Sequence, residues 1–314
     1  MAPVLVALRG LGLGDLLTAV PALRGLRRAY PGHRIVLATP APLAELVRTI
    51  DAVDDSVDVS GTGPVPVRAP DIAVNLHGSG PQSTAALLAT SPGRLLCHAH
   101  PDLPQVQGPP WRYEVHEVVR WCALLGWYGL PADPGDLALP PPSRPPTVRP
   151  DEAGGYAVVH PGAAFPARRW PPDRFAEVAA WLHRAGHRVL ITGGDAERDL
   201  ALRVAALAGI PERRVLAGRT GIGDLAALVA SARLVVCGDT GVAHLATAYA
   251  TPSVVLFGPT PPRLWGPPEG GPHIPLWAGR SGDPHGGTPD PGLLRINVRD
   301  VLDAIATLLK GHPW

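Results

Sequence analysis

The most chemically suggestive residues lie where an apolar run near position 235 ends. The run 234–237 is followed by Gly-Asp-Thr-Gly at 238–241 and then by a helical pattern. Asp239 or Thr240 can cap that helix, and Gly241 leaves its first N–H groups uncovered. Such a helix start binds phosphate through unpaired donors and the positive end of the helix dipole. His244, one turn further on, either contacts the same ligand or has a purely structural role. The segment predicts an anion site.

Two other loops in this half of the chain carry groups that suit a nucleoside diphosphate. Gly162, Ala163 and Ala164 follow an earlier apolar run, and Arg168 lies just beyond them. Its guanidinium either pairs with two phosphate oxygens or is solvated. Glu197, after a Gly-Gly pair, could accept hydrogen bonds from ribose hydroxyls. Because loops after parallel strands meet at one sheet edge, we expect these residues to line one site for a nucleoside diphosphate.

A glycine-rich loop after the first apolar run contains the best candidate for a general base. Gly10, Gly12 and Gly14 are spaced G-x-G-x-G, and Asp15 follows. A dinucleotide site would instead need G-x-G-x-x-G and an acidic residue about 20 positions on, so the pattern argues against a nicotinamide cofactor. Asp15 either caps the next helix or acts as a base, since a carboxyl with an ordinary pKa of about 3.9 is ionised at neutral pH. Asp15→Asn is expected to keep nucleotide binding and lose most turnover.

The elements that must position these residues alternate between strands and helices. In the first half we expect strands at Pro3–Leu8, Arg34–Ala38, Ile72–Asn75 and Arg94–Cys97, and helices at Asp15–Ala29, Pro42–Thr49, Gln82–Thr90 and Tyr113–Trp127. In the second half we expect strands at Tyr156–His160, Arg188–Thr192, Arg214–Leu216, Leu234–Cys237 and Ser253–Phe257, and helices at Asp173–Ala185, Glu197–Ala208, Asp224–Ser231, Thr240–Tyr249 and Val298–Leu309. Such alternation predicts βαβ units and parallel sheets.

A proline-rich segment, Pro140–Pro150, separates the two series, with six prolines in eleven residues. Proline at this density cannot continue a helix or a central strand, so the segment is expected to be a semi-rigid linker. We therefore predict two α/β domains, 1–140 and 151–314, that face each other across a cleft. The final helix could pack back on the first domain. A second Pro/Gly-rich stretch, Gly258–Pro291, is expected to be a functional loop or mobile.

Composition excludes several classes of protein. The formal net charge is +1 with both signs interspersed, which gives no broad field for nucleic acid or an anionic membrane. We expect no transmembrane segment and no signal peptide. The three cysteines are widely spaced, which favours reduced thiols and a cytoplasmic protein. Cys97, His98 and His100 crowd together, but no fourth metal ligand stands at a recognisable spacing, so no metal site is expected.

Taken together, these motifs resemble glycosyltransferase family 9, the ADP-heptose heptosyltransferases. The matching segments are Gly14-Asp15 with Pro21-Ala22-Leu23, Asn75-Leu76-His77-Gly78, His160-Pro161-Gly162, Arg168-Arg169-Trp170-Pro171, Gly238 to His244 and Phe257-Gly258-Pro259-Thr260. The resemblance implies a GT-B fold, with two Rossmann-like, doubly wound domains facing a cleft. It also implies inversion at the anomeric carbon without a metal or other cofactor.

The resemblance further assigns roles to residues of both domains. It makes Asp15 the general base, places Glu197 near the donor ribose and turns Arg168 towards the donor phosphates. It implies that Asp239 contacts the sugar and that Thr240 and Gly241 contact the diphosphate. On this basis 1–140 is the acceptor-binding domain and 151–314 the domain that binds the nucleotide-sugar donor. We expect the acceptor near Gly12, Gly14, Asn75 and His77, and near the loops 61–70 and 98–111.

The chain departs from the family pattern in ways that bear on its substrates. Ala163 and Ala164 stand where heptosyltransferases often carry hydroxyl residues that bind phosphate, so backbone donors must do more or the donor differs. No basic cluster suited to a phosphorylated lipid A core is present. We therefore expect a heptose, from ADP-heptose, to be transferred to a hydroxyl of a glycan or small-molecule acceptor (a natural product or cell-envelope glycan) other than lipopolysaccharide. The alternatives are a nucleotide-sugar epimerase on the same scaffold and a non-catalytic nucleotide-sugar binding protein.

Overall fold

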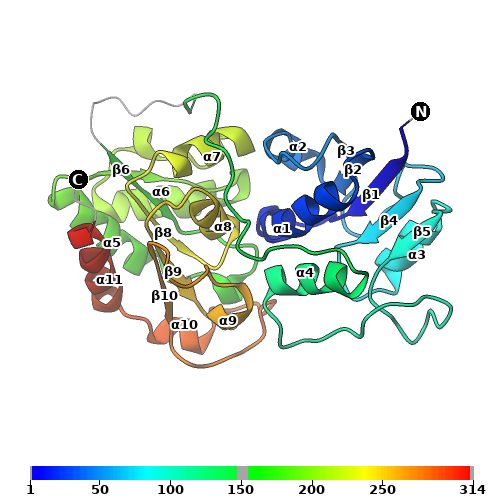
Figure 1. Ribbon diagram of the computed structural model, residues 1–314. Coiled ribbons are helices and arrows are strands. Elements are labelled where there is room, and N and C mark those ends of the chain that lie inside the picture. Colours follow the sequence, from blue (N-terminus) through cyan, green and yellow to red (C-terminus); the bar gives the residue numbers. More distant parts are fainter. Residues whose placement is uncertain (1, 147–154, 312–314) are drawn as a thin grey trace. The chain divides into compact units, whose positions relative to one another are not determined.

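The computed structural model describes residues 2–146 and 155–311. The chain divides into two compact units, 1–140 and 141–314, so the division falls at the first residues of the proline-rich segment. Residues 147–150 of the expected linker lie outside the described residues. Figure 1 shows that each unit contains one sheet with helices packed against it.

The first unit is built on five parallel strands in the order β3-β2-β1-β4-β5. The strands are β1 (Val4–Leu8), β2 (Arg34–Thr39), β3 (Asp55–Asp58), β4 (Ile72–Asn75) and β5 (Arg94–Leu96). The helices are α1 (Leu13–Ala29), α2 (Ala44–Val47), α3 (Gln82–Leu88) and α4 (Glu117–Trp127), with a 3₁₀ turn at Ala41–Leu43. The central strands are buried on both faces, which explains their nearly unbroken aliphatic sequences.

Helices α1 and α4 pack against each other in this unit (Figure 1). Helix α1 has no side-chain cap at Gly12, and Asp15 lies in its first turn, so Asp15 is not the N-cap residue. Pro21 lies inside α1 and is buried with its apolar neighbours. Helix α4 starts later than predicted because the side chain of His116 accepts a hydrogen bond from the N–H of Val118 and so caps the helix there.

The second unit is also built on five parallel strands, in the order β10-β9-β8-β6-β7. The strands are β6 (Tyr156–His160), β7 (Arg188–Ile191), β8 (Leu234–Gly238), β9 (Ser253–Phe257) and β10 (His273–Trp277). The helices are α5 (Pro172–Arg184), α6 (Arg198–Ala208), α7 (Ile222–Ala230), α8 (Gly241–Ala248), α9 (Pro262–Trp265), α10 (Pro291–Arg295) and α11 (Val298–Gly311), with 3₁₀ turns at Pro166–Arg168, Asp195–Glu197 and Glu212–Arg214.

The last helix, α11, belongs to the second unit and not to the first. Its buried residues Val301, Ile305 and Leu308 share one core with Trp170 and Phe175. In Figure 1, α11 lies beside α5, against which it packs. The apolar face of α11 is therefore covered within the second unit.

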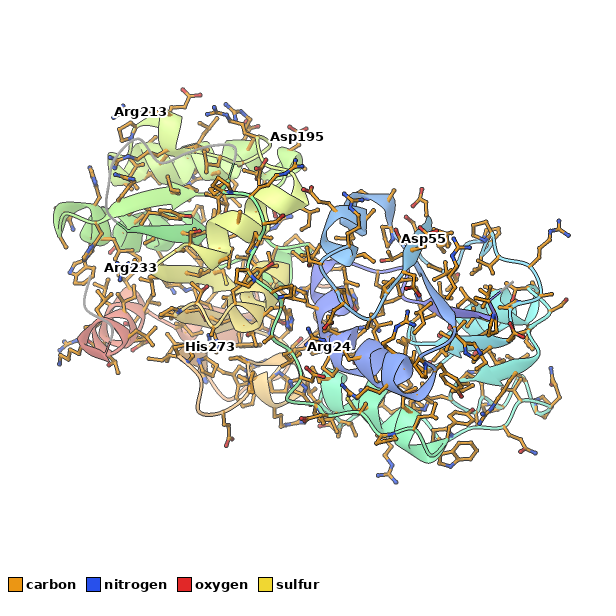
Figure 2. The ribbon with its side chains drawn as sticks, turned by 45° about the horizontal axis from the view of Figure 1, so that its top comes forward. Arg24, Asp55, Asp195, Arg213, Arg233 and His273 are labelled. Atoms are coloured by element: carbon orange, nitrogen blue, oxygen red, sulfur yellow. The ribbon has the colours of Figure 1, made fainter. Side chains whose placement is uncertain are left out.

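Three of the differences from prediction concern strands, and all three lie at sheet edges. Strand β3 was not predicted because its sequence, Asp-Ser-Val-Asp, is mostly polar and exposed. Strand β10 lies within the Pro/Gly-rich stretch, and its Pro275 is tolerated because β10 pairs only with β9. Figure 2 labels Asp55 and His273 on these two strands. The predicted strand at 214–216 is wrong, since only Val215 forms a single bridge, to Ile191.

Each sheet has one topological switch point, a strand on either side of which the strand order runs in opposite directions. In the first unit β1 lies between β2 and β4, and Leu8 pairs with Asn75 at the carboxyl ends of β1 and β4. In the second unit β6 lies between β7 and β8, and His160 pairs with Cys237. Ligands of open parallel sheets bind outside the strand ends at such switch points. The glycine-rich loop with Asp15 and the Gly-Asp-Thr-Gly segment are therefore both placed where a ligand is expected.

Candidate functional site

The start of α8 has the features of an anion site. Thr240 is the N-cap residue, yet its hydroxyl makes no hydrogen bond to the helix. Its Oγ1 atom is buried and has no partner among the described residues. Because an unsatisfied buried hydroxyl costs free energy, this atom is poised to bond a ligand. Asp239 is buried, and its N–H donates to the carbonyl of Leu256 at 3.1 Å, so the turn is held to β9.

Arg168 lies next to this turn. A Cβ atom on Gly238 would be 3.1 Å from the carbonyl oxygen of Arg168 and 4.0 Å from Cγ2 of Thr240, so the three residues are neighbours. The Nε atom of Arg168 is buried and also lacks a partner among the described residues. Its guanidinium lies 5.5 Å from the ring centroid of Phe165. A cation donor and a hydroxyl are thus left unsatisfied beside one helix start, which suits a phosphate.

The loop after β6 meets the loop after β7 through Glu197. A Cβ atom on Gly162 would overlap the Glu197 carboxylate, so the two residues are in close contact and a larger residue at 162 would displace that carboxylate. Oε2 of Glu197 accepts a hydrogen bond from the N–H of Gly194 at 2.8 Å and lies 3.8 Å from Nε2 of His160. Burial lowers the pKa of His160, although the charge of Glu197 opposes this shift. The ring is therefore neutral near pH 7, and Glu197 remains available to ribose hydroxyls.

The remaining predicted donor residues take different positions. Ala163 is buried and its carbonyl accepts a hydrogen bond from Nε of Arg169 at 2.8 Å, so Arg169 holds the loop and is not a free cation. Ala164 is exposed and adds no polar side chain. The ring of His244 lies 5.9 Å from that of Trp265 in an edge-on arrangement, which places His244 beside α9.

In the first unit, Asp15 lies at the carboxyl end of β1 with part of its side chain exposed. Its Oδ1 accepts a hydrogen bond from Nη2 of Arg9 at 3.2 Å, and 28% of the Asp15 side chain is accessible to solvent. Burial raises the pKa of Asp15 above the ordinary value of 3.8; the charge of Arg9 and backbone hydrogen bonds oppose the rise, and Glu117 adds to it. Asp15 is therefore a stronger base than an ordinary aspartate, and it can be reached by a substrate.

Two of the predicted acceptor-side residues, Asn75 and His77, differ in how far they can reach a ligand. Asn75 is fully buried, and its amide donates to Ser83 and Thr84 at 2.9 and 3.0 Å. Its Oδ1 accepts the N–H of His77 at 3.0 Å, so Asn75 is corrected from an acceptor contact to a residue that holds the loop. His77 accepts the N–H of Gly10 on Nδ1 at 3.2 Å, which places its proton on Nε2. Burial and the charge of Arg9 lower the pKa of His77, so it is a neutral donor.

The glycines of the loop after β1 differ in the space that is free beside them. A Cβ atom on Gly10 would collide with the carbonyl oxygen of Gly61, which brings the loop after β3 close to the loop after β1. Gly12 is exposed and has open space beside it, apart from Asp15 Oδ2 at 3.6 Å from a would-be Cβ. Gly14 is half-buried in the first turn of α1. Gly12 therefore leaves room for an acceptor next to Asp15.

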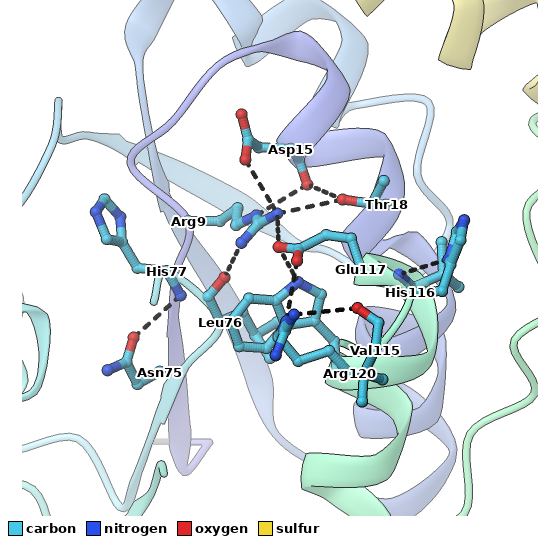
Figure 3. A network of polar contacts seen from close by, with 12 residues as sticks. Arg9, Asp15, Thr18, Asn75, Leu76, His77, Val115, His116, Glu117 and Arg120 are labelled. Atoms are coloured by element: carbon cyan, nitrogen blue, oxygen red, sulfur yellow. Dashed lines mark hydrogen bonds and ion pairs between the residues drawn. The ribbon is translucent and has the colours of Figure 1, made fainter. Parts of the chain in front are cut away.

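Three charged residues of the first unit were missed by the sequence analysis. Arg9 is completely buried, and it bonds Glu117 of α4, which in turn bonds Arg120 (Figure 3). The only signal in the sequence was a charged residue directly after an apolar strand. Glu117 lies 108 positions from Arg9, so local spacing could not pair them.

Comparisons with known proteins show the family of this chain. The family model described as glycosyltransferase family 9 (heptosyltransferase) matches residues 107–272, more than half of the chain. The chain belongs to glycosyltransferase family 9. This protein is therefore a heptosyltransferase-like glycosyltransferase. A search of curated protein sequences found no match.

Solved structures show the fold of this family-9 protein. A glycosyl transferase family 9 protein from Veillonella parvula is 21% identical, with a TM-score of 0.80 over 98% of this chain and 97% of the other. ADP-heptose lipopolysaccharide heptosyltransferase II of E. coli is 20% identical, with a TM-score of 0.78 over 99% and 100%. E. coli heptosyltransferase WaaC with ADP is 19% identical, with a TM-score of 0.71 over 97% and 99%. The predicted GT-B fold with two Rossmann-like sheets is confirmed.

The donor-side geometry makes a testable prediction for this family-9 glycosyltransferase. Arg168→Ala should weaken binding of ADP about 10- to 100-fold, because a hydrogen bond to a charged group contributes about 1.5–3 kcal/mol. Isothermal titration calorimetry with ADP measures this change. Arg213→Ala, an exposed arginine of the same unit labelled in Figure 2, is the matched control and should bind like the unmodified chain. Equal affinity in the two variants would show that Arg168 is not a phosphate ligand.

Proposed function

We propose that this protein is an inverting transferase that moves a heptose from ADP-heptose to a hydroxyl of a non-lipopolysaccharide acceptor. One observation supports the proposed binding site of the sugar donor. Two buried polar atoms at the β6/β8 switch point, Nε of Arg168 and Oγ1 of Thr240, have no partner within residues 2–146 and 155–311. They flank the start of α8, where a diphosphate would satisfy both together with the first N–H groups of the helix.

The reaction is one displacement in which charge and protons balance. An acceptor hydroxyl attacks the anomeric carbon of the donor sugar as Asp15 takes its proton. The new bond joins the acceptor oxygen to that carbon, the bond to the phosphate oxygen breaks, and ADP leaves with the negative charge. Arg168 and the start of α8 stabilise this charge where it develops. Attack from the face opposite the leaving group inverts the configuration.

The acceptor side of the proposal rests on the first unit. Asp15 is partly exposed, His77 offers a neutral N–H donor, and Gly12 leaves space beside the carboxylate. A sugar or small-molecule hydroxyl is an uncharged group that such a set can orient. A non-lipopolysaccharide acceptor is supported by the interspersed charge of the chain, which has a formal net charge of +1.

The proposed reaction needs no metal, because Arg168 and α8 supply the positive charge for the leaving group. Within the described residues, no three His, Cys, Asp or Glu side chains are grouped so that they could hold a metal ion. EDTA should therefore leave the transfer rate unchanged. Loss of activity in EDTA that is restored by a divalent cation would overturn this part of the proposal.

We also propose that the protein acts in the cytoplasm. Its three cysteines are all free and buried, as in a reducing compartment. No helix in the described parts of the chain has the length and apolar character needed to cross a bilayer.

Thermal-shift measurements against ADP-, GDP-, UDP- and TDP-sugars test the donor. A ligand at 100 times its Kd should stabilise the folded state by about 2.7 kcal/mol, and we expect this from ADP-heptose. Product analysis then separates the alternatives. A transferase gives an acceptor heavier by one heptosyl unit, an epimerase alters the donor alone, and a binding protein changes neither. A preference for another nucleotide would overturn the ADP-heptose assignment while leaving the family intact.

A further inference from the structure

The guanidinium of Arg9 is the centre of a buried polar network in the first unit (Figure 3). Its Nε donates to the carbonyl of Asp15 at 2.9 Å, and its Nη1 donates to the carbonyl of Leu76 at 2.5 Å. These bonds join the end of β1 to the first turn of α1 and to the end of β4. Arg9 is completely buried, so its charge must be balanced by nearby acidic groups.

Two carboxylates compete for the remaining nitrogen of Arg9. Nη2 lies 2.9 Å from Oε1 of Glu117, 3.2 Å from Oδ1 of Asp15 and 3.2 Å from Oγ1 of Thr18. Glu117 has the shortest of these contacts. Nη2 carries only two hydrogens. Because one of them bonds Glu117, the hydrogen bond from Nη2 to Asp15 is longer and weaker.

Glu117 is itself fixed by two further donors. Its Oε1 accepts Nε1–H of Trp121 at 3.0 Å, and its Oε2 accepts Nε–H of Arg120 at 3.0 Å. The Trp121 ring also lies beneath Arg9, with the guanidinium carbon 4.8 Å from the ring centroid. Glu117 therefore cannot turn towards Asp15 or solvent without losing these bonds.

The four charged groups of the network differ in their access to solvent. Side-chain exposure is 0% for Arg9, 10% for Glu117 and 7% for Arg120, but 28% for Asp15. Two cations and two carboxylates leave the network neutral. Asp15 is thus the member best placed to exchange a proton with a substrate, because Glu117 and Arg120 are buried.

We propose that Glu117 is a positioning residue for Asp15, because it takes up the charge of Arg9 and so leaves the Asp15 carboxylate free to act as a strong base. The chemistry rests on the proposed function, in which Asp15 accepts the proton of the acceptor. Without Glu117, Arg9 would pair with Asp15 alone and stabilise its ionised form. A carboxylate held in that way is a weaker base and a poorer catalyst at neutral pH.

The electrostatics of Asp15 agree with this role. Burial raises its pKa, Arg9 lowers it, and Glu117 raises it again. His77 also lies near Arg9, and its lowered pKa keeps it neutral, so it adds no charge. Arg120 is separated from Asp15 by Glu117, which it contacts directly. Removing Glu117 should therefore lower the pKa of Asp15, whereas removing Arg9 should raise it.

NMR titration of aspartate side-chain carboxyl carbons tests the inference without any transferase assay. The Asp15 signal is assigned by its loss in Asp15→Asn. In the unmodified chain it should titrate above an ordinary aspartate; Glu117→Gln should lower its pKa by about one unit and Arg9→Met should raise it by about one unit. Structural loosening would move both variants towards the ordinary value, so opposite shifts distinguish the proposed role.

Glu45→Gln is the matched control, since Glu45 is an exposed residue of α2 and the charge change is the same. It should leave the Asp15 titration unchanged. Should Glu117→Gln not fold, the unmodified chain still tests the inference, because an Asp15 carboxylate paired with Arg9 alone would titrate below an ordinary aspartate. An Asp15 pKa below the ordinary value in the unmodified chain, or shifts of the same sign in both variants, would overturn the inference. If the Asp15 pKa shifts as predicted but the protein transfers no sugar, the result would count against the proposed function and not against the role of Glu117.

Discussion

Replacing Asp15 by asparagine should lower sugar transfer about 10²–10⁴-fold while leaving donor affinity unchanged, because a positioned general base contributes about that factor. Asparagine keeps the size of the side chain and an oxygen that can accept the hydrogen bond from Arg9, but it cannot take a proton. Turnover is measured as nucleoside diphosphate released in the presence of acceptor, and affinity by calorimetry with ADP. Near-normal turnover would remove Asp15 from the role of base.

Asp51→Asn is a suitable control for this change, because 71% of its side chain is exposed and it lies in the same unit. It should transfer sugar at the normal rate. The pH dependence gives a second check. Since burial raises the pKa of Asp15 above 3.8, kcat/KM should fall on the acidic side as the pH drops through that raised value. An acidic limb below pH 3.8 would contradict the assignment.

Replacing Glu117 by alanine should lower the free energy of unfolding by about 3–5 kcal/mol, the cost of leaving a buried charge without its partner. Arg9 and Arg120 would both lose a carboxylate, and Nε1–H of Trp121 would lose its acceptor. Urea denaturation measures this loss. Glu45→Ala, an exposed glutamate in the same unit, should change stability by less than about 0.5 kcal/mol. Similar stability in both variants would show that the network contributes little.

The same residue predicts a pH dependence of stability. Burial opposes ionisation of Glu117, but the charges and hydrogen bonds of Arg9 and Arg120 outweigh it and lower the pKa below 4.5. Stability from Glu117 is therefore present above pH 4.5 and is lost as the pH falls through its value in the folded state. The difference in unfolding free energy between the unmodified chain and Glu117→Ala should narrow in that range. A difference that stays constant down to pH 2 would contradict this account.

Local sequence was sufficient to place a candidate residue that lies within a few positions of the strand end that carries it. The turn at Asp239 and Thr240 follows β8 directly, and Asp15 follows β1 by a single loop. Parallel sheets bring such ends to one edge, so motif and topology together place the residues. The buried, aliphatic strands were also predicted well, since burial on both faces requires an apolar sequence.

Sequence reasoning did not predict contacts between residues far apart in the chain, and it did not predict strands that are only partly buried. The bond between Arg9 and Glu117 spans 108 positions, and no periodic pattern connects an arginine after β1 with a glutamate at the start of α4. Asn75 was expected near the acceptor through its place in the family motif Asn75-Leu76-His77-Gly78, but it is buried and bonded to α3. The edge strands β3 and β10 escaped prediction because one is polar and the other contains proline.

The position of ADP bound to this protein tests the account most directly. In a crystal structure of the ADP complex, the diphosphate should bond the first N–H groups of α8, the hydroxyl of Thr240 and Nε of Arg168. All three groups would then be satisfied by one ligand. A diphosphate bound instead at the loop of Gly10 to Gly14 would place the donor in the first unit and contradict both the donor site and the role given to Asp15.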